Sequence, residues 1–143
     1  MRRGWVRQGY ICTRPVVRIR VTEWENNELS YVLCFKGKGS LARQETEIAL
    51  TPQTFNELAA LLRGPFIQKD YRVYRLPDGH LLECSLVDAG KPTSYMFAEI
   101  EFDSEAEALA YPAPPQVGPE ITGKGLGMAH YWEKTRGGLD EKP

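Results

Sequence analysis

Charged side chains recur two residues apart along several segments of this 143-residue chain. Arg18 and Arg20 form a basic pair, and Glu99 and Glu101 form an acidic pair. The stretch RQETEIAL (43–50) places a cation and two carboxylates at alternate positions, namely Arg43, Glu45 and Glu47. Grouped cations can bind the oxygens of a polyphosphate, and grouped carboxylates suit divalent metal ions, which prefer hard oxygen ligands. These residues could therefore support the binding of a phosphate-rich anion together with a metal ion.

The spacing of two is the period of a β-strand, in which alternate side chains share one face. The intervening positions are apolar in two of these segments, for example at Ile19 and Ile100. In one arrangement the sheet covers a core with its apolar face and exposes the charges to water. In the other, the sheet curls so that the charges line an interior, which is costly unless they meet opposite charges there. The pattern alone leaves both arrangements open.

The elements that must position these residues are mostly strands. We predict strands at 9–23, 29–39, 43–50, 66–76, 80–87 and 95–102. We predict helices at 51–64, 104–111 and 127–135. The first of these helices has Thr51 as its N-cap and Gly64 as its C-terminal stop, and Asn26-Asn27 fits a hairpin turn. The pattern predicts an α+β fold with a mainly antiparallel sheet, one domain at 1–135, and a flexible tail at 136–143.

Composition excludes several classes of function. The 18 basic and 19 acidic residues nearly cancel, so no overall field attracts the chain to nucleic acid or to a membrane. No apolar run approaches the length of a membrane span. We therefore expect neither nucleic acid nor a membrane as a partner. The cysteines (Cys12, Cys34 and Cys84) are widely spaced and indicate reduced core thiols in a cytoplasmic protein. We expect His80, beside the turn in PDGH, to be an exposed loop residue.

An ordered series of motifs resembles the CYTH domain, the triphosphate tunnel metalloenzyme family. The motifs are VRIR, FKGKG, RQETEIAL, IQK, DGHLLECSL, AEIEFDSEAEA and GPEITG, which run in order from about residue 8 to residue 122. The resemblance implies a tunnel of antiparallel strands with charges inside and helices packed outside. Members of this family hydrolyse inorganic triphosphate, thiamine triphosphate or nucleoside triphosphates, or cyclise ATP.

The resemblance also implies roles for individual residues. The residues at phosphate-binding positions are Arg18, Arg20, Lys36, Arg43 and Lys69. The residues at acidic or metal-holding positions are Glu45, Glu47, Glu83, Glu99 and Glu101. The implied cofactor is Mg²⁺ or Mn²⁺, which can bridge phosphates and orient an attacking water. We assign no residue a separate catalytic role.

The chain departs from the family pattern in three places. The acidic first-strand signature ExExK is absent, and residues 1–11 resemble the approach to the second strand. We therefore expect an open or incomplete barrel, and we expect the first strand to lie upstream of Met1 rather than the chain to be degenerate. An acidic residue expected after Glu83 is replaced by Ser85, and an arginine expected two residues after Lys69 is replaced by Tyr71.

These features lead to three functional hypotheses. The first is metal-dependent hydrolysis of a small triphosphate, with inorganic tripolyphosphate as the first candidate and thiamine or nucleoside triphosphates as others. The second is a degenerate tunnel that binds a polyphosphate or nucleotide without turnover, which the absence of ExExK and the presence of Ser85 motivate. The third is an adenylyl cyclase of the CYTH type.

Overall fold

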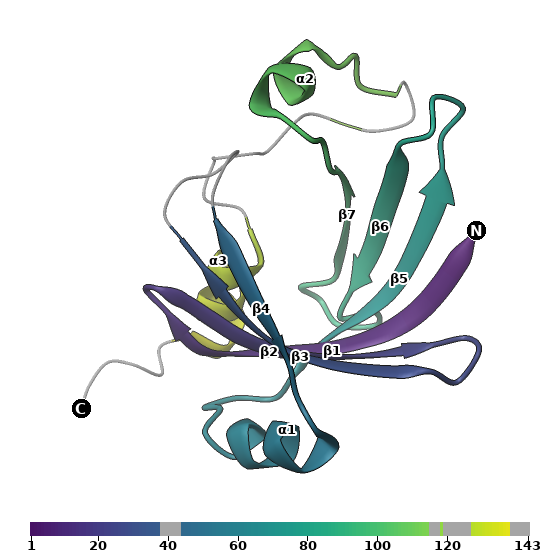
Figure 1. Cartoon of the computed structure of the whole chain (residues 1–143). Helices are drawn as coiled ribbons and strands as arrows, with labels where there is room; N and C mark the ends of the chain where they lie inside the picture. Colours follow the sequence, from purple (N-terminus) through teal and green to yellow (C-terminus); the bar gives the residue numbers. More distant parts are fainter. Residues whose placement is uncertain (38–43, 115–117, 119–126, 138–143) are drawn as a thin grey trace.

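The computed structural model describes residues 1–37, 44–114, 118 and 127–137, and it is built on a seven-stranded antiparallel sheet (Figure 1). The strands are β1 (Arg2–Thr13), β2 (Val16–Trp24), β3 (Leu29–Lys36), β4 (Glu45–Ala49), β5 (Ile67–Arg75), β6 (Leu81–Val87) and β7 (Tyr95–Ile100). Their order across the sheet is β4-β3-β2-β1-β5-β6-β7. The predicted mainly antiparallel α+β fold is confirmed. Among the described residues β4 and β7 do not pair, so the barrel is open as expected.

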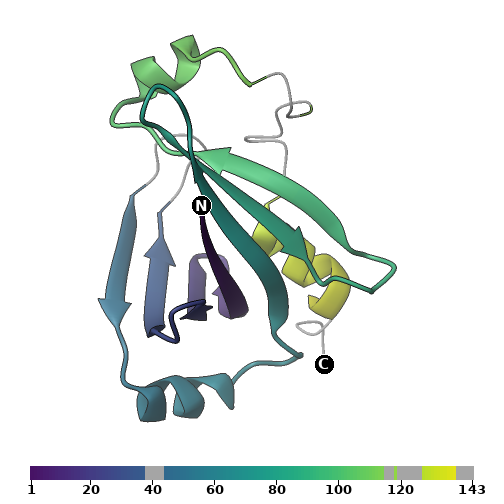
Figure 2. The same ribbon diagram turned by 90° about the vertical axis from the view of Figure 1, so that its right-hand side faces the viewer.

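The sheet bends strongly along its width. Figure 2 shows β3 and β4 on one side of the molecule and β6 and β7 on the other, with β1 between them. This bend turns one face of the sheet inward across its whole width. We call this surface the inward face and the opposite surface the outward face.

The N-terminal segment differs from the prediction. Residues 1–11, expected to be only the approach to a strand, supply most of β1, which pairs with β2 on one side and β5 on the other. The predicted single strand at 9–23 is instead a hairpin, because the chain turns at Arg14 and Pro15 between β1 and β2. Asn27 has a positive φ of 71° in the turn that joins β2 to β3, which confirms the predicted hairpin turn.

The first two helices are shorter than predicted, whereas the last helical segment extends beyond its predicted end at residue 135. They are α1 (Pro52–Ala59), α2 (Glu105–Ala110) and α3 (Met128–Trp132), and α3 continues into the π-helical η1 (Glu133–Gly137). Thr51 caps α1 as predicted, because its side chain accepts a hydrogen bond from the Thr54 N–H. The helix ends at Ala59 rather than near Gly64, so Leu61 leaves the helical face and is 61% exposed. No helix of the described residues is long and apolar enough to cross a membrane.

Two apolar clusters lie on opposite faces of the sheet. On the outward face, Ile19 and Val21 of β2 pack against Phe55 of α1. On the inward face, Tyr10 of β1 packs against Trp132 of α3, together with Ile67, Val87 and Tyr131. The resemblance implied helices outside the tunnel. That holds for α1, whereas α3 covers part of the inward face.

Arg136 fixes η1 to the rest of the fold. This residue was expected to begin the flexible tail, but it is only 7% exposed. Its guanidinium donates to Asp88 Oδ2 at 2.8 Å and to the backbone carbonyls of Pro65 and Phe66, each at 3.0 Å. Tyr131 also donates to Asp88, at 2.7 Å. Burial acts to raise the pKa of Asp88, but the bonds from Arg136, the Gln68 N–H and Tyr131 outweigh it and hold that pKa below its ordinary value.

Replacing Arg136 by methionine should destabilise the protein, because it leaves the buried Asp88 carboxylate without its cation. We expect a loss of about 3–5 kcal/mol in the free energy of unfolding at pH 7, measured by urea denaturation. Adding Asp88→Asn should recover part of this loss by removing the buried charge. Glu28→Gln breaks only the exposed Arg2–Glu28 pair and should have little effect. A loss for Arg136→Met no larger than that of Glu28→Gln would contradict this account.

Candidate functional site

The strand registers place the predicted site residues on the inward face. Arg18 lies opposite Tyr10 on one side and Cys34 on the other. Directly opposed residues share a face, as do alternate residues along one strand. Applied across the sheet, these two rules give one inward-facing set: Arg18, Arg20, Lys36, Glu45, Glu47, Lys69, Glu83 and Glu99. Glu101 follows β7 directly, and Arg43 lies outside the described residues.

The basic residues of this set converge although they come from three strands. Lys69 of β5 has a pKa lowered to about 7, first by burial and then by the positive charges of Arg18, Arg20 and Lys36, which Glu99 partly offsets. Cations on β2 and β3 can lower the pKa of a lysine on β5 only if the sheet brings the side chains of these three strands close together. Together with the shared face and the bend of the sheet (Figure 2), this places the charges along an open interior, which is the second of the two arrangements that the sequence left open.

Arg18 is the most buried of these cations, at 7% exposed. Its pKa is raised: burial acts to lower it, but the neighbouring Tyr10, Cys34 and Glu45 outweigh that effect. Its Nε makes no hydrogen bond within the described part of the chain. A buried guanidinium with a donor to spare is suited to an anionic ligand, because it has already lost its water.

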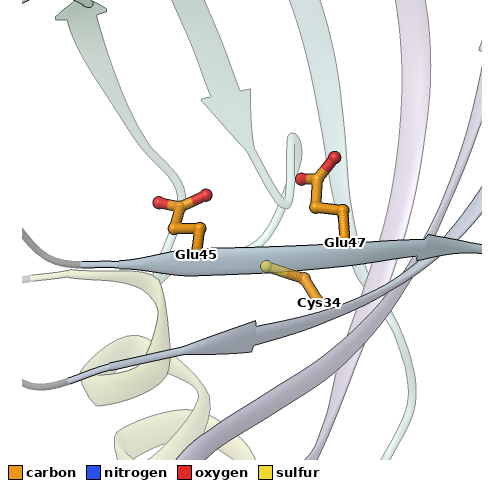
Figure 3. A group of neighbouring side chains, drawn as sticks. All are labelled: Cys34, Glu45 and Glu47. Atoms are coloured by element: carbon orange, nitrogen blue, oxygen red, sulfur yellow. The ribbon is translucent and has the colours of Figure 1, made fainter.

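Glu45 and Glu47 of β4 form a compact group with the Cys34 thiol of β3 (Figure 3). One potential ligand atom from each of the three residues lies within 4.8 Å of the others. Both carboxylates already have cationic partners: Lys36 Nζ lies 3.5 Å from Glu45, and Arg20 lies 3.8 Å from Glu47. The negative charge of this group is therefore largely balanced.

The second acidic group, from β6 and the end of β7, is not balanced in this way. Glu83 lies directly opposite Glu99, and neither these residues nor Glu101 make an ion pair with another described residue. The pKa of Glu101 is raised, first by burial and then by Glu83, Glu99, Glu45 and Glu47. Carboxylates from both edges of the sheet thus lie within electrostatic range of one another. Within the described structure, Glu83, Glu99 and Glu101 do not form a compact group like that of Cys34.

Three inward-facing residues were missed as site candidates. Gln8 is fully buried and donates to the Tyr10 hydroxyl at 3.2 Å, while its Oε1 has no partner among the described residues. Cys34, predicted to be a reduced core thiol, is buried as expected but lies among the charges. Tyr71 donates to Glu83 at 2.6 Å, and burial followed by Glu83 raises the pKa of Tyr71, so the phenol remains a donor. Their spacing of two from one another or from charged residues was a signal that could have identified them.

His80 is not an exposed loop residue, as the sequence suggested, since its side chain is only 22% exposed. Its ring nitrogens lie 3.1 Å from Asp78 and 3.2 Å from Glu107, and the adjacent Asp78 carboxylate is the main reason that the pKa of His80 is raised. Glu83 and Glu101 line the same small cavity as His80. The imidazole therefore links the β5–β6 turn to α2 beside the unbalanced carboxylates.

Comparison with known proteins is consistent with this geometry. No protein-family model matches the chain. The inorganic triphosphatase of Nitrosomonas europaea is 35% identical over 118 residues, which make up 82% of this chain and 76% of that protein. The chain therefore belongs to the inorganic triphosphatase family.

Solved structures agree with this assignment. The crystal structure of the inorganic triphosphatase NE1496 matches with a TM-score of 0.52 and 25% identity, covering 99% of this chain and 88% of that one. The structure of the PH1819 protein from Pyrococcus horikoshii matches with a TM-score of 0.54 over 99% of this chain and 78% of that one. At 17% identity, this second likeness shows the fold alone.

Lys69 should make stability depend on pH. Its pKa is about 7 in the folded protein and 10.5 in the unfolded reference, so the unfolded chain binds more protons between these values. The free energy of unfolding should therefore gain a contribution that rises with pH from about 7 to about 10. Lys69→Met should remove this contribution and flatten the slope, measured by urea denaturation at a series of pH values. Lys91→Met, at an exposed lysine, is the control. Equal slopes in the wild type and Lys69→Met would contradict the interior placement of Lys69.

Proposed function

We propose that this protein is a metal-dependent triphosphatase of the CYTH type, with inorganic tripolyphosphate as its first candidate substrate. The observation that carries the proposal is the placement of Arg18, Arg20 and Lys36 on the same inward face as the half-buried Lys69, whose pKa their charges lower. Such a group of cations repels itself when empty and is stabilised by a polyanion. Membership of the inorganic triphosphatase family supports the same substrate class.

The cations would bind the phosphate oxygens directly. Arg18 offers an unused Nε donor, and guanidinium groups bind phosphate through charge-assisted hydrogen bonds. Arg20 and Lys36 would exchange their present partners, Glu47 and Glu45, for the substrate. That exchange would release both carboxylates for another cation. We retain Arg43 as a further candidate for phosphate binding on the sequence pattern alone.

The acidic residues fit Mg²⁺ or Mn²⁺. Glu83, Glu99 and Glu101 supply hard carboxylate oxygens, and no described cation forms an ion pair with them. Glu45 and Glu47 would join them once Lys36 and Arg20 turn to the substrate. A bound ion of this kind supplies neutralisation of phosphoryl charge.

The reaction would be hydrolysis of a phosphoanhydride bond. Water attacks a terminal phosphorus atom, the bond to the bridging oxygen breaks, and tripolyphosphate yields pyrophosphate and phosphate. The basic residues would stabilise negative charge on the transferred group and on the leaving pyrophosphate. The free thiols of Cys12, Cys34 and Cys84 support a reducing, cytoplasmic location.

A binding module without turnover is the second candidate. Tyr71 and Ser85, the two replaced family positions, lie directly opposite each other on β5 and β6. Both departures therefore fall at one place on the inward face, where the resemblance implied a cation and an anion. A neutral pair at this place favours a site that binds phosphate but has lost part of its catalytic charge.

Anion binding can be tested through thermal stability. Tripolyphosphate at a hundred times its dissociation constant should stabilise the folded state by roughly 2.7 kcal/mol. For a domain of this size that corresponds to a shift of several degrees in the melting midpoint. Sulfate at matched ionic strength should give a much smaller shift, because it cannot contact all four cations.

Changing both Arg18 and Arg20 to alanine should abolish most of the tripolyphosphate shift. Changing Arg7 and Arg72 to alanine removes the same charge from the outward face and should leave the shift intact. Equal shifts in the two double variants would place tripolyphosphate binding outside the inward face.

Hydrolysis can be tested by phosphate release from tripolyphosphate with Mg²⁺ or Mn²⁺. Replacing Glu99 and Glu101 together by glutamine keeps their size and removes two candidate metal ligands. Removing a residue that only orients a metal ligand typically lowers metal affinity or activity by roughly 10–100-fold. We expect the double variant to lose more than this, both in the rate of phosphate release and in Mn²⁺ affinity. The control pair Glu23→Gln and Glu25→Gln should change neither quantity.

A panel of thiamine triphosphate and nucleoside triphosphates, with product analysis for cyclic AMP, would define the substrate. Binding of tripolyphosphate without release of phosphate from any member of the panel would favour the binding module over the enzyme.

A further inference from the structure

Glu83 is held differently from the other unbalanced carboxylates. The Tyr71 hydroxyl donates to Glu83 Oε1 at 2.6 Å, a short distance that marks a strong, charge-assisted hydrogen bond. Within the described residues, Glu99 and Glu101 have no such donor. One oxygen of Glu83 is thus fixed by the protein, and its Oε2 remains available.

The position of the Tyr71 ring is set by packing across β1. Gly4 of β1 lies opposite both Trp24 of β2 and Tyr71 of β5. Because Gly4 has no side chain, the rings of Trp24 and Tyr71 meet over it, with centroids 5.8 Å apart and planes inclined at 57°. A Cβ atom at Gly4 would lie 2.9 Å from Trp24 Cε3, so alanine would disturb this contact. The Arg2 guanidinium lies 3.7 Å from the Trp24 ring centroid.

We propose that Tyr71 is a positioning residue that orients Glu83 to bind a divalent cation through Oε2. This inference deepens the proposed function and rests on its metal requirement. Hydrogen bonds that orient a metal ligand commonly change metal affinity by about 10–100-fold when removed. A carboxylate that the fold has already oriented loses less rotational freedom on binding a cation.

The alternative is that Tyr71 only stabilises the β5–β6 pair. Removing the hydroxyl would then lower stability without changing the affinity of the folded protein for metal. The two roles can be separated because Tyr71→Phe keeps the ring and its contact with Trp24. Tyr74→Phe is a matched control, since Tyr74 lies on the same strand but on the outward face.

The experiment measures Mn²⁺ affinity of the whole chain from the electron paramagnetic resonance signal of free Mn²⁺. We expect Tyr71→Phe to weaken Mn²⁺ binding about 10-fold and Tyr74→Phe to leave it unchanged. Glu83→Gln should weaken binding at least as much as Tyr71→Phe. In the Glu83→Gln background, Tyr71→Phe should have little further effect, because its influence acts through Glu83. Circular dichroism and melting curves establish that each variant is folded.

Unchanged Mn²⁺ affinity in folded Tyr71→Phe would overturn the inference, and phosphate release by the wild type would still uphold the proposed function. If Tyr71→Phe weakened Mn²⁺ binding by the same factor in the Glu83→Gln background as in the wild type, the inference would also be overturned, because the phenol would then act independently of Glu83. Absence of Mn²⁺ binding by the wild type would overturn both the positioning role and the metal requirement. If the wild type binds Mn²⁺ but releases no phosphate, hydrolysis fails, while a loss specific to Tyr71→Phe still supports the positioning role.

Discussion

The main constraint on this fold is the repulsion among the cations on its inward face, which the rest of the structure has to offset. Arg18, Arg20 and Lys36 act together with burial to lower the pKa of Lys69, because charges interact more strongly where water is partly excluded. The registers of β2, β3 and β4 relieve part of the repulsion by placing Glu45 and Glu47 beside two of the cations. Because side chains alternate along a strand, a slip of one residue in these registers would turn the balancing carboxylates outward.

Apolar packing on both faces maintains the bend that this electrostatic arrangement requires. On the outward face Phe55 of α1 covers the apolar residues of β2 and shields that part of the face from water. On the inward face, Trp132 of α3 packs against Tyr10 and closes off part of the interior with aromatic side chains. The bonds of Arg136 fix this helical segment to the ends of β5 and β6. The inward face is thus divided into an apolar part under α3 and a charged part.

Much of this could be predicted because charged residues two apart on a strand must share a face. The same rule did not locate β1, since its first residues carry no clear alternation and are held as a strand by pairing with both neighbours. Tyr71 and Gln8 were missed because they are neutral: their spacing of two from Lys69 and Tyr10 hinted at a shared face, but their contacts depend on the register across strands. Glu45 and Glu47 are balanced because they lie beside Lys36 and Arg20, whereas Glu83, Glu99 and Glu101 have no such partner among the described residues. This difference is set by the folded sheet, so it could not be predicted from the sequence.

The pKa of Lys69, about 7, also has a consequence for the exchange of protons with the solvent. Near neutral pH the empty protein holds this amine as a mixture of charged and uncharged forms. An anion that settles beside the amine favours the charged form, so its arrival draws a fraction of a proton from the buffer, and its departure returns it. For the proposed anion site, the affinity should then fall as pH rises above 7, and each cycle of binding and release would carry protons along with the ligand.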